Sequence, residues 1–340
     1  MMAGMHSDVL HRLGHHPRLL GAREWVREQR ARYFNVELGH VRRARRRLRR
    51  RDLDVLYLGD STTSFVAPDD ADRRRLPAML QDEVAPLRVE TLFGGGYNQV
   101  LYREFVRLLD PTPQRPQVIV MSLCIRATTT VHVNEHPLHG YRASLELLKG
   151  LDGGRLPTAI RRNPTPTVAD YARFESLPVT TRWSGARLIG DFRRELKDRD
   201  GLDPAARERS LFDYFHGEVV DPLHPGLTSW RALGKQLTAY GVPVVAYRNP
   251  VPVREGQRIL GADFEQHVES NFATIEQAFL ETAPEGTRMV DAGTFETAEF
   301  LDPADATEHL NERGRLRLAR AVAAEVRDVL GAPAERSTSG

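Results

Sequence analysis

Cysteine is nearly absent from this sequence of 340 residues, in which Cys124 is the only one. One cysteine cannot form a disulfide within the chain, and it cannot build a cysteine-ligated metal site. The sequence also lacks a histidine–carboxylate spacing typical of a metal site, a Gly-x-x-x-x-Gly-Lys phosphate loop and a Gly-x-Gly-x-x-Gly fingerprint. We therefore expect neither a metal ion nor a cofactor.

Long apolar runs are missing as well. No stretch approaches the roughly 18 apolar residues that a membrane-spanning helix needs. The opening residues, MMAGMHSDVLHRLGHH, lack the apolar core of a signal peptide. Apolar residues make up 41% of the chain and charged residues 28%, which is ordinary for a globular protein with a sizeable core. These features predict a cytoplasmic protein without a membrane span.

Lysine is scarce, and arginine takes its place as the basic residue. The chain has only three lysines, whereas residues 42–51 read RRARRRLRRR. Such a block can be a patch for nucleic acid, a membrane or an acidic partner. It can also be the solvated face of a helix, and we favour this second interpretation because arginine is the chain's usual basic residue. We expect no nucleic-acid partner, and nothing in the sequence indicates an oligomeric state.

Short apolar runs alternate with helical segments along most of the chain. A helical pattern over about 22–51 comes first. The apolar runs are residues 53–58, 89–93, 117–123, 242–247 and 288–291. This alternation predicts an α/β fold, a three-layer sandwich with helices on both faces of a parallel sheet. Five strands is the number of the flavodoxin-like arrangement.

The domain organisation follows from this pattern. We expect a basic helical segment at 1–52, one α/β domain over 53–331 and a disordered tail at 332–340. Residues 132–225 separate the third and fourth strands and contain no predicted strand, only short amphipathic pieces such as 186–197. A stretch of this length is too long for a simple crossover. We interpret it as a helical, cap-like insertion at the carboxyl edge of the sheet, with Asn134 and His136 as residues that could line a pocket.

The first candidate for chemistry is Gly59-Asp60-Ser61, directly after the first predicted strand. A serine there lies at the carboxyl edge of a parallel sheet, where open α/β folds place their sites. Backbone N–H groups at the start of a following helix could stabilise an oxyanion. The same triplet is also an ordinary turn and cap sequence, so its position after the strand is what makes it a candidate.

The second candidate is His309, at the entry to the last predicted helix. Histidine is the usual base for a serine nucleophile because its pKa lies near neutrality. A lone histidine is more often an incidental surface residue. Here it follows the last predicted strand, so the fold would return it to the same edge of the sheet as Ser61.

These residues together resemble the SGNH (GDSL-like) hydrolase superfamily, of which the chain would be a divergent member. The resemblance rests on the strand-ending Gly-Asp-Ser, the glycine-rich turn Gly94-Gly95-Gly96-Tyr97-Asn98 and the histidine before the last helix. It implies a flavodoxin-like esterase, lipase, acyl hydrolase or carbohydrate O-acetyltransferase. It also implies that Ser61 attacks the acyl carbonyl, that His309 takes the serine proton and that the N–H groups of Ser61 and Gly96 bind the oxyanion.

One departure from the family pattern follows the third strand. The superfamily has a Gly-x-Asn-Asp block there, whereas this chain has Ser122-Leu-Cys-Ile-Arg126. The asparagine position, a third oxyanion donor, is therefore held by Cys124 or Arg126. Arg126 could donate in its place, could bind a carboxylate or phosphate of the substrate, or could pair with a nearby acid. A strand-end cysteine is more often core than nucleophile.

A second departure concerns the acid that orients the histidine. The family places an aspartate three residues before it, but position 306 is alanine. We expect Asp305 to serve, because a one-residue bulge would restore its reach, and we expect the adjacent Glu308 to point away from His309. Asn249, after the fourth strand, could donate to the substrate or could simply form an Asn-Pro turn.

The functional prediction is a serine-dependent ester hydrolase or acyltransferase. It would act through an acyl-enzyme on a small-molecule or carbohydrate ester, with Ser61, His309 and Asp305 as catalytic residues. Gly96, Asn98, Cys124, Arg126 and Asn249 would line the oxyanion or substrate site. The alternative is a catalytically repurposed member of the fold that serves as a binding module.

Overall fold

The computed structural model describes residues 36–132, 141–157, 166–197, 201 and 203–331. The predicted tail at 332–340 lies outside these residues, as do Asn134, His136 and the part of the N-terminal segment before residue 36. Within the described part of the chain, the predicted first helix is α3, Val36–Arg49.

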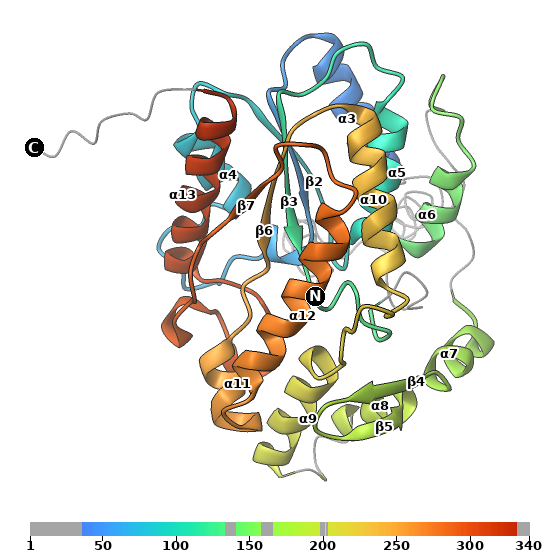
Figure 1. The fold of residues 1–340 in the computed structure, drawn as a ribbon, viewed down its shortest axis with the longest axis vertical. Helices are drawn as coiled ribbons and strands as arrows, with labels where there is room; N and C mark the ends of the chain where they lie inside the picture. Colours follow the sequence, from blue (N-terminus) through green and yellow to red (C-terminus); the bar gives the residue numbers. More distant parts are fainter. Residues whose placement is uncertain (1–35, 133–140, 158–165, 198–200, 202, 332–340) are drawn as a thin grey trace, which may run out of the picture.

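Five parallel strands form the central sheet (Figure 1). They are β1 (Val55–Gly59), β2 (Val89–Phe93), β3 (Val118–Leu123), β6 (Val244–Arg248) and β7 (Arg288–Val290). Their order in the sheet is β2-β1-β3-β6-β7, which is the flavodoxin-like order. The predicted fold is therefore confirmed, and each strand lies within two residues of its expected bounds.

Helices cover both faces of the sheet because alternate strand residues point to opposite sides. Leu56, Leu58 and Met121 join one buried apolar cluster, whereas Tyr57 and Val120 join the other. The first face is covered by α3, α5 (Gln99–Leu109), α10 (Leu227–Tyr240) and α12 (Phe264–Leu280). The second is covered by α4 (Leu76–Glu83) and α13 (Glu312–Val329). Another helix, α11 (Val253–Leu260), follows β6 and packs on α12.

The insertion between β3 and β6 contains strands, which the sequence analysis did not expect. Its elements are α6 (Arg142–Lys149), α7 (Val168–Glu175), β4 (Pro178–Thr181), β5 (Gly185–Leu188), α8 (Ile189–Lys197) and α9 (Pro204–His216). β4 and β5 form an antiparallel hairpin. The β-branched run of β4 favours a strand, and Gly185 supplies a turn residue with φ of 67°. The helix expected from residue 186 therefore begins only at Ile189.

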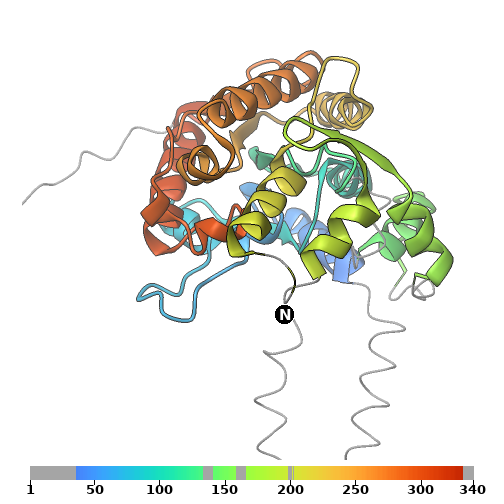
Figure 2. The ribbon, with the colours of Figure 1, turned by 90° about the horizontal axis from the view of Figure 1, so that it is seen from below.

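The hairpin and α7–α9 lie beyond the carboxyl ends of the central strands, at the bottom of Figure 1 and toward the viewer in Figure 2. Polar contacts attach this insertion to the edge. Glu218 accepts hydrogen bonds from the backbone N–H of Thr130 at 2.8 Å and from its hydroxyl at 2.6 Å. His216 Nε2 lies 2.9 Å from the carbonyl oxygen of Ala306, in the loop that carries His309. The insertion is thus in contact with the candidate site.

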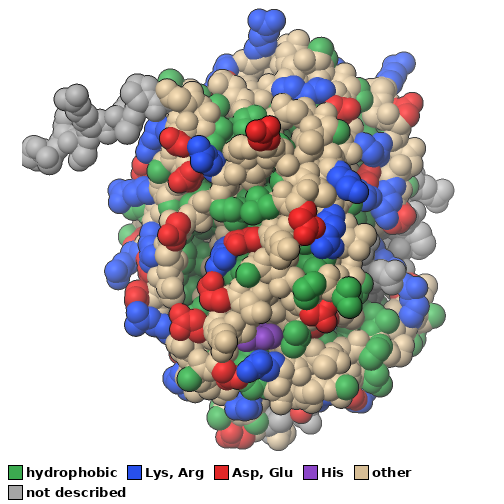
Figure 3. Space-filling model, viewed as in Figure 1, with side chains coloured by type: hydrophobic (Ala, Val, Ile, Leu, Met, Phe, Trp, Pro, Cys, Tyr) green, Lys and Arg blue, Asp and Glu red, His purple; other side chains and the backbone are tan. Residues whose placement is uncertain are grey.

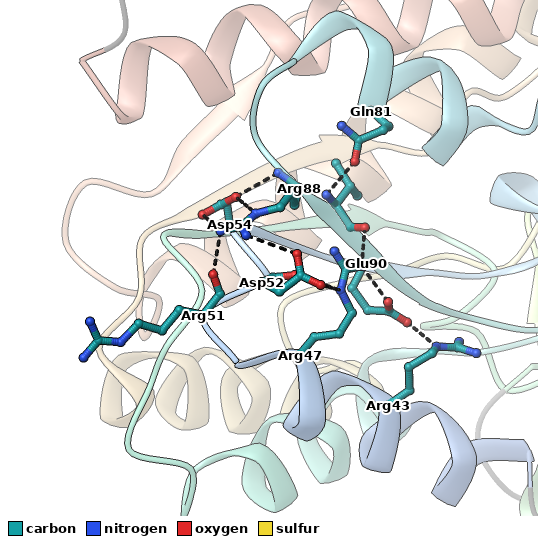
Figure 4. Close-up of polar contacts among 9 residues, drawn as sticks. Arg43, Arg47, Arg51, Asp52, Asp54, Gln81, Arg88 and Glu90 are labelled. Atoms are coloured by element: carbon teal, nitrogen blue, oxygen red, sulfur yellow. Dashed lines mark hydrogen bonds and ion pairs between the residues drawn. The ribbon is translucent and has the colours of Figure 1, made fainter. Parts of the chain in front are cut away.

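The arginine block at 42–51 is partly structural. Arg45 is buried and donates to the carbonyl oxygens of Gly153 and Gly154 at 2.7 and 3.0 Å. Arg43 and Arg47 both pair with Glu90 on β2 (Figure 4). The block therefore fastens α3 to the sheet, and its remaining arginines are exposed.

Charged side chains of both signs are interspersed over the face shown in Figure 3. Among the described residues, no helix is both long enough and apolar enough to cross a bilayer.

Candidate active site

The Gly-Asp-Ser triplet forms a tight turn at the carboxyl end of β1. Asp60 caps the 3-10 helix η1 (Ser61–Thr63), because its Oδ1 accepts hydrogen bonds from the Thr62 N–H at 2.8 Å and from the Thr62 hydroxyl at 2.6 Å. A Cβ at Gly59 would lie 2.5 Å from the Thr63 side chain, so the turn requires glycine. The result is a half-buried Ser61 at the edge of the sheet.

Asn249 stabilises this turn through a hydrogen bond to Asp60. Its side chain is 1% exposed, and its Nδ2 donates to Asp60 Oδ2 at 3.0 Å. Its backbone N–H donates to the Leu123 carbonyl oxygen at 2.8 Å. The structure therefore does not support the expected contact with substrate, since burial at the strand end directs the amide to Asp60.

His309 reaches the same edge from the loop between β7 and α13. The loop folds back on itself, because the Leu301 N–H donates to the His309 carbonyl oxygen at 2.9 Å. Asn311 then caps α13 by accepting from the N–H groups of Arg313 and Gly314. In this position His309 Nε2 lies 3.3 Å from Ser61 Oγ. Two residues 248 positions apart in sequence are within hydrogen-bonding distance, a separation that is common between a serine and its base before substrate binds.

The imidazole of His309 is neutral at neutral pH. Burial, followed by the positive charge of Arg126, lowers the pKa of His309 to about 4. A neutral ring can accept a proton from a hydroxyl. The nearby guanidinium disfavours the imidazolium that this transfer would create. The ring can therefore accept a proton at neutral pH, but it is a weak base.

Asp305 does not orient this ring. It ends the 3-10 helix η3 (Pro303–Asp305) and its side chain is exposed. The chain then turns through Ala306, whose φ is 52°, before it reaches His309. No carboxylate of the described residues is within ion-pair distance of the His309 ring, so the expected bulge does not bring Asp305 into contact.

Glu308 points away from His309, as expected, and binds Arg126. Its side chain is only 4% exposed and that of Arg126 is 18% exposed. Arg126 also has its guanidinium carbon 4.3 Å from the centre of the Phe215 ring, and its Nη2 is 3.3 Å from His132 Nε2. Of the three roles considered for Arg126, the geometry supports pairing with a nearby acid.

Cys124 is part of the core beneath this pair. Its side chain is buried, and Sγ lies 4.0 Å from Glu308 Oε1. Burial, together with the charge of Glu308, raises the pKa of the Cys124 thiol. A protonated, inaccessible thiol is a poor nucleophile and a poor oxyanion donor.

The glycine-rich turn after β2 contains Gly96, whose N–H was expected to be an oxyanion donor. Gly96 has φ of 73°. Among the described residues, neither its N–H nor that of Ser61 has a hydrogen-bond acceptor. Asn98 differs from expectation, because it is 2% exposed and caps α5, while its Nδ2 donates to the Tyr141 hydroxyl at 2.8 Å. Its polar atoms are therefore committed to the fold.

Phe65 lies in the candidate site, and no sequence signal indicated its place there. Its ring stacks on the His309 imidazole, with centroids 4.4 Å apart and planes inclined by 8°. Phe65 lies in an irregular loop, where no periodicity indicates which way a side chain points.

Within the described residues, no group of histidine, cysteine, aspartate or glutamate side chains could hold a metal ion.

No family model matches this sequence, and no curated protein matches it. Several solved structures resemble the fold. A carbohydrate acetylesterase family member from Sinorhizobium meliloti is 13% identical, with a TM-score of 0.36, over 82% of this chain and 100% of its own. LAE5, an α/β hydrolase from the metagenome of Lake Arreo in Spain, is 10% identical, with a TM-score of 0.39, over 82% and 95%. A variant of Axe2, an acetyl xylan esterase from Geobacillus stearothermophilus, is 13% identical, with a TM-score of 0.37, over 84% and 97%. Likenesses this distant say nothing about what this chain acts on.

Proposed function

We propose that this protein is a serine-dependent acyl hydrolase or acyltransferase of the SGNH type, with Ser61 as nucleophile and His309 as general base. The observation that carries the proposal is the 3.3 Å separation of Ser61 Oγ and His309 Nε2 at the carboxyl edge of the sheet. The low pKa of His309, about 4, keeps its ring in the proton-accepting form at neutral pH.

In the proposed reaction, Ser61 Oγ attacks the acyl carbonyl while its proton passes to His309 Nε2. The tetrahedral oxyanion accepts hydrogen bonds from the N–H groups of Ser61 and Gly96. Collapse of this intermediate expels the alcohol, which takes the proton from His309, and leaves an acyl-enzyme. Water or an acceptor alcohol then attacks the acyl group, with His309 again as base, and frees Ser61.

The acyl donor we propose is a small-molecule or carbohydrate ester. Hydrolysis and transfer use the same nucleophile and base, so the site geometry is compatible with both. The contacts between the insertion and the site, through Phe215 and His216, favour a shielded pocket. Exclusion of water from such a pocket is what transfer to an acceptor requires.

A second candidate is a repurposed member of the fold that binds a ligand without chemistry. It is favoured by the missing carboxylate at His309 and by the Arg126 charge, which disfavours an imidazolium. Against it stands the short separation of Ser61 and His309, which a binding role does not require. The two candidates make opposite predictions about turnover.

Ester turnover tests the proposal. A panel of p-nitrophenyl and acetylated sugar esters would be incubated with wild type, Ser61→Ala and Ser176→Ala near pH 8. Ser176 is exposed and remote in sequence from the site, so it is a matched serine control. We expect turnover by wild type and Ser176→Ala and none by Ser61→Ala, and product analysis with added alcohols would separate transfer from hydrolysis. Equal turnover by Ser61→Ala would refute the proposal.

A further inference from the structure

We infer that Phe65 is a positioning residue that holds the His309 imidazole in place of the missing carboxylate. The inference rests on the proposed function and adds to it how the base is oriented. A carboxylate usually fixes both the plane and the tautomer of such a histidine. In the described residues, the hydrogen-bond partner of the His309 ring is the Ser61 hydroxyl on Nε2, and its aromatic partner is the stacked Phe65 ring on its face.

The stacking geometry constrains the ring plane. Centroids 4.4 Å apart and planes only 8° from parallel put the two rings in van der Waals contact over much of one face. Rotation of the imidazole about its χ2 angle would break this contact. The stack therefore restricts the imidazole to the plane in which Nε2 can face Ser61, without any hydrogen bond to Nδ1 from the described residues.

The nucleophile and the stacked ring belong to the same short segment. The Phe65 N–H donates to the Ser61 carbonyl oxygen at 3.1 Å, and the Ser64 N–H donates to the same oxygen at 3.1 Å. Asp60 anchors the start of this segment through Thr62. Because one turn carries both groups, local backbone hydrogen bonds set the position of the Phe65 backbone relative to that of Ser61.

Phe65 also covers one face of the imidazole. Burial is the main cause of the low pKa of His309, and the phenyl ring supplies part of that burial. Loss of the ring should therefore do two things: it should loosen the alignment of Nε2 with Ser61, and it should raise the pKa of His309. A side chain that only fills space in the core would do neither.

The test compares Phe65→Leu, which removes the aromatic face, with Phe65→Tyr, which keeps it. One readout is the second-order rate of Ser61 labelling by a fluorophosphonate across pH 4–9. The other is the NMR titration of the His309 ring, assigned with His309→Gln. We expect Phe65→Leu to lower the plateau labelling rate about 2- to 12-fold. We also expect its His309 pKa to move up from about 4 toward the ordinary 6.5, while Phe65→Tyr retains both wild-type values.

The inference is overturned if Phe65→Leu keeps the wild-type rate and the wild-type His309 titration, or if Phe65→Tyr is as impaired as Phe65→Leu. Thermal unfolding checks that each variant is folded, and Phe65→Met replaces the leucine variant if that one is not. A wild type that is never labelled would contradict the proposed function alone, since the His309 titration still reports whether Phe65 controls the ring.

Discussion

The two ends of the central sheet both carry arginine–carboxylate pairs, but in different surroundings. At the amino end, Arg88 pairs with Asp52 and Asp54 (Figure 4). The side chains of Arg88 and Asp52 are each 46% exposed and that of Asp54 is 14% exposed. At the carboxyl end, Arg126 pairs with Glu308, and the side chains are 18% and 4% exposed. The arginine–carboxylate pairs at the amino end are therefore more exposed to solvent than the pair at the carboxyl end.

This difference in burial decides what each pair can do. Exposed pairs contribute little to stability because water and salt screen them. A buried pair acts on its neighbours through a lower dielectric, and the Arg126 charge adds to burial in lowering the pKa of His309. Burial likewise raises the pKa of Glu308 despite its partner. At the carboxyl end, charged side chains can therefore shift the pKa of His309.

The largest effect should follow removal of the proposed base, His309, at the carboxyl end. His309→Ala should lower the rate of Ser61 acylation about 10²- to 10⁴-fold, the usual contribution of a general base. Arg88→Gln, at the amino end, is the matched control and should leave the rate unchanged. Labelling kinetics with a fluorophosphonate measure both. Equal rates in wild type and His309→Ala would show that the ring does no proton transfer.

Removal of the buried arginine should cost stability. Arg126→Gln leaves Glu308 buried without its cation, and the free energy of unfolding at pH 7 should fall by about 3–5 kcal/mol. Urea unfolding followed by circular dichroism measures this change. The double variant Arg126→Met with Glu308→Leu should recover much of the loss, because no charge is then buried. A single variant as stable as wild type would mean that the pair is effectively solvated.

The pH profile tests the neighbouring base. Because the pKa of His309 is lowered, its ring stays neutral as the pH falls and is protonated only near pH 4. At pH 5.5 an imidazole of pKa about 4 is about 97% neutral, whereas an ordinary one is about 9% neutral. The acid limb of Ser61 labelling should therefore lie near pH 4 in wild type.

Arg126→Gln should move this limb to higher pH, because it removes one of the two causes of the shift. Labelling rates at constant ionic strength between pH 4 and 8 provide the comparison. A wild-type limb near pH 6.5 would contradict the buried environment described for His309.

The smallest effect should come from the exposed pair. Arg88→Gln should change the urea midpoint far less than Arg126→Gln does, and the change should shrink further as salt is added. Parallel unfolding curves at low and high salt measure it. If Arg88→Gln lowered the stability as much as Arg126→Gln does, the two ends of the sheet would not differ in the way described.

The fold could be predicted because its signals are local. Apolar runs such as 117–123 mark buried strands, and parallel strands align their carboxyl ends at one edge. That rule predicts that residues after β1 and after β7 lie at the same edge of the sheet, and the structure places Ser61 and His309 3.3 Å apart. Their catalytic roles remain a proposal.

The side-chain pairings could not be predicted, because they depend on tertiary geometry. Nothing local shows that Asn249 binds Asp60, that Asn98 binds Tyr141, or that Phe65 stacks on His309. The expected role of Asp305 failed for the same reason. The family spacing predicts a carboxylate near the ring, but a left-handed turn at Ala306 intervenes.

The most direct test of the proposed nucleophile is intact-mass analysis after exposure to a fluorophosphonate near pH 8, with wild type, Ser61→Ala and the control Ser176→Ala. We expect one adduct on wild type and on Ser176→Ala, mapped by peptide analysis to Ser61, and none on Ser61→Ala. No adduct on folded wild type, or an adduct that persists in Ser61→Ala, would contradict it.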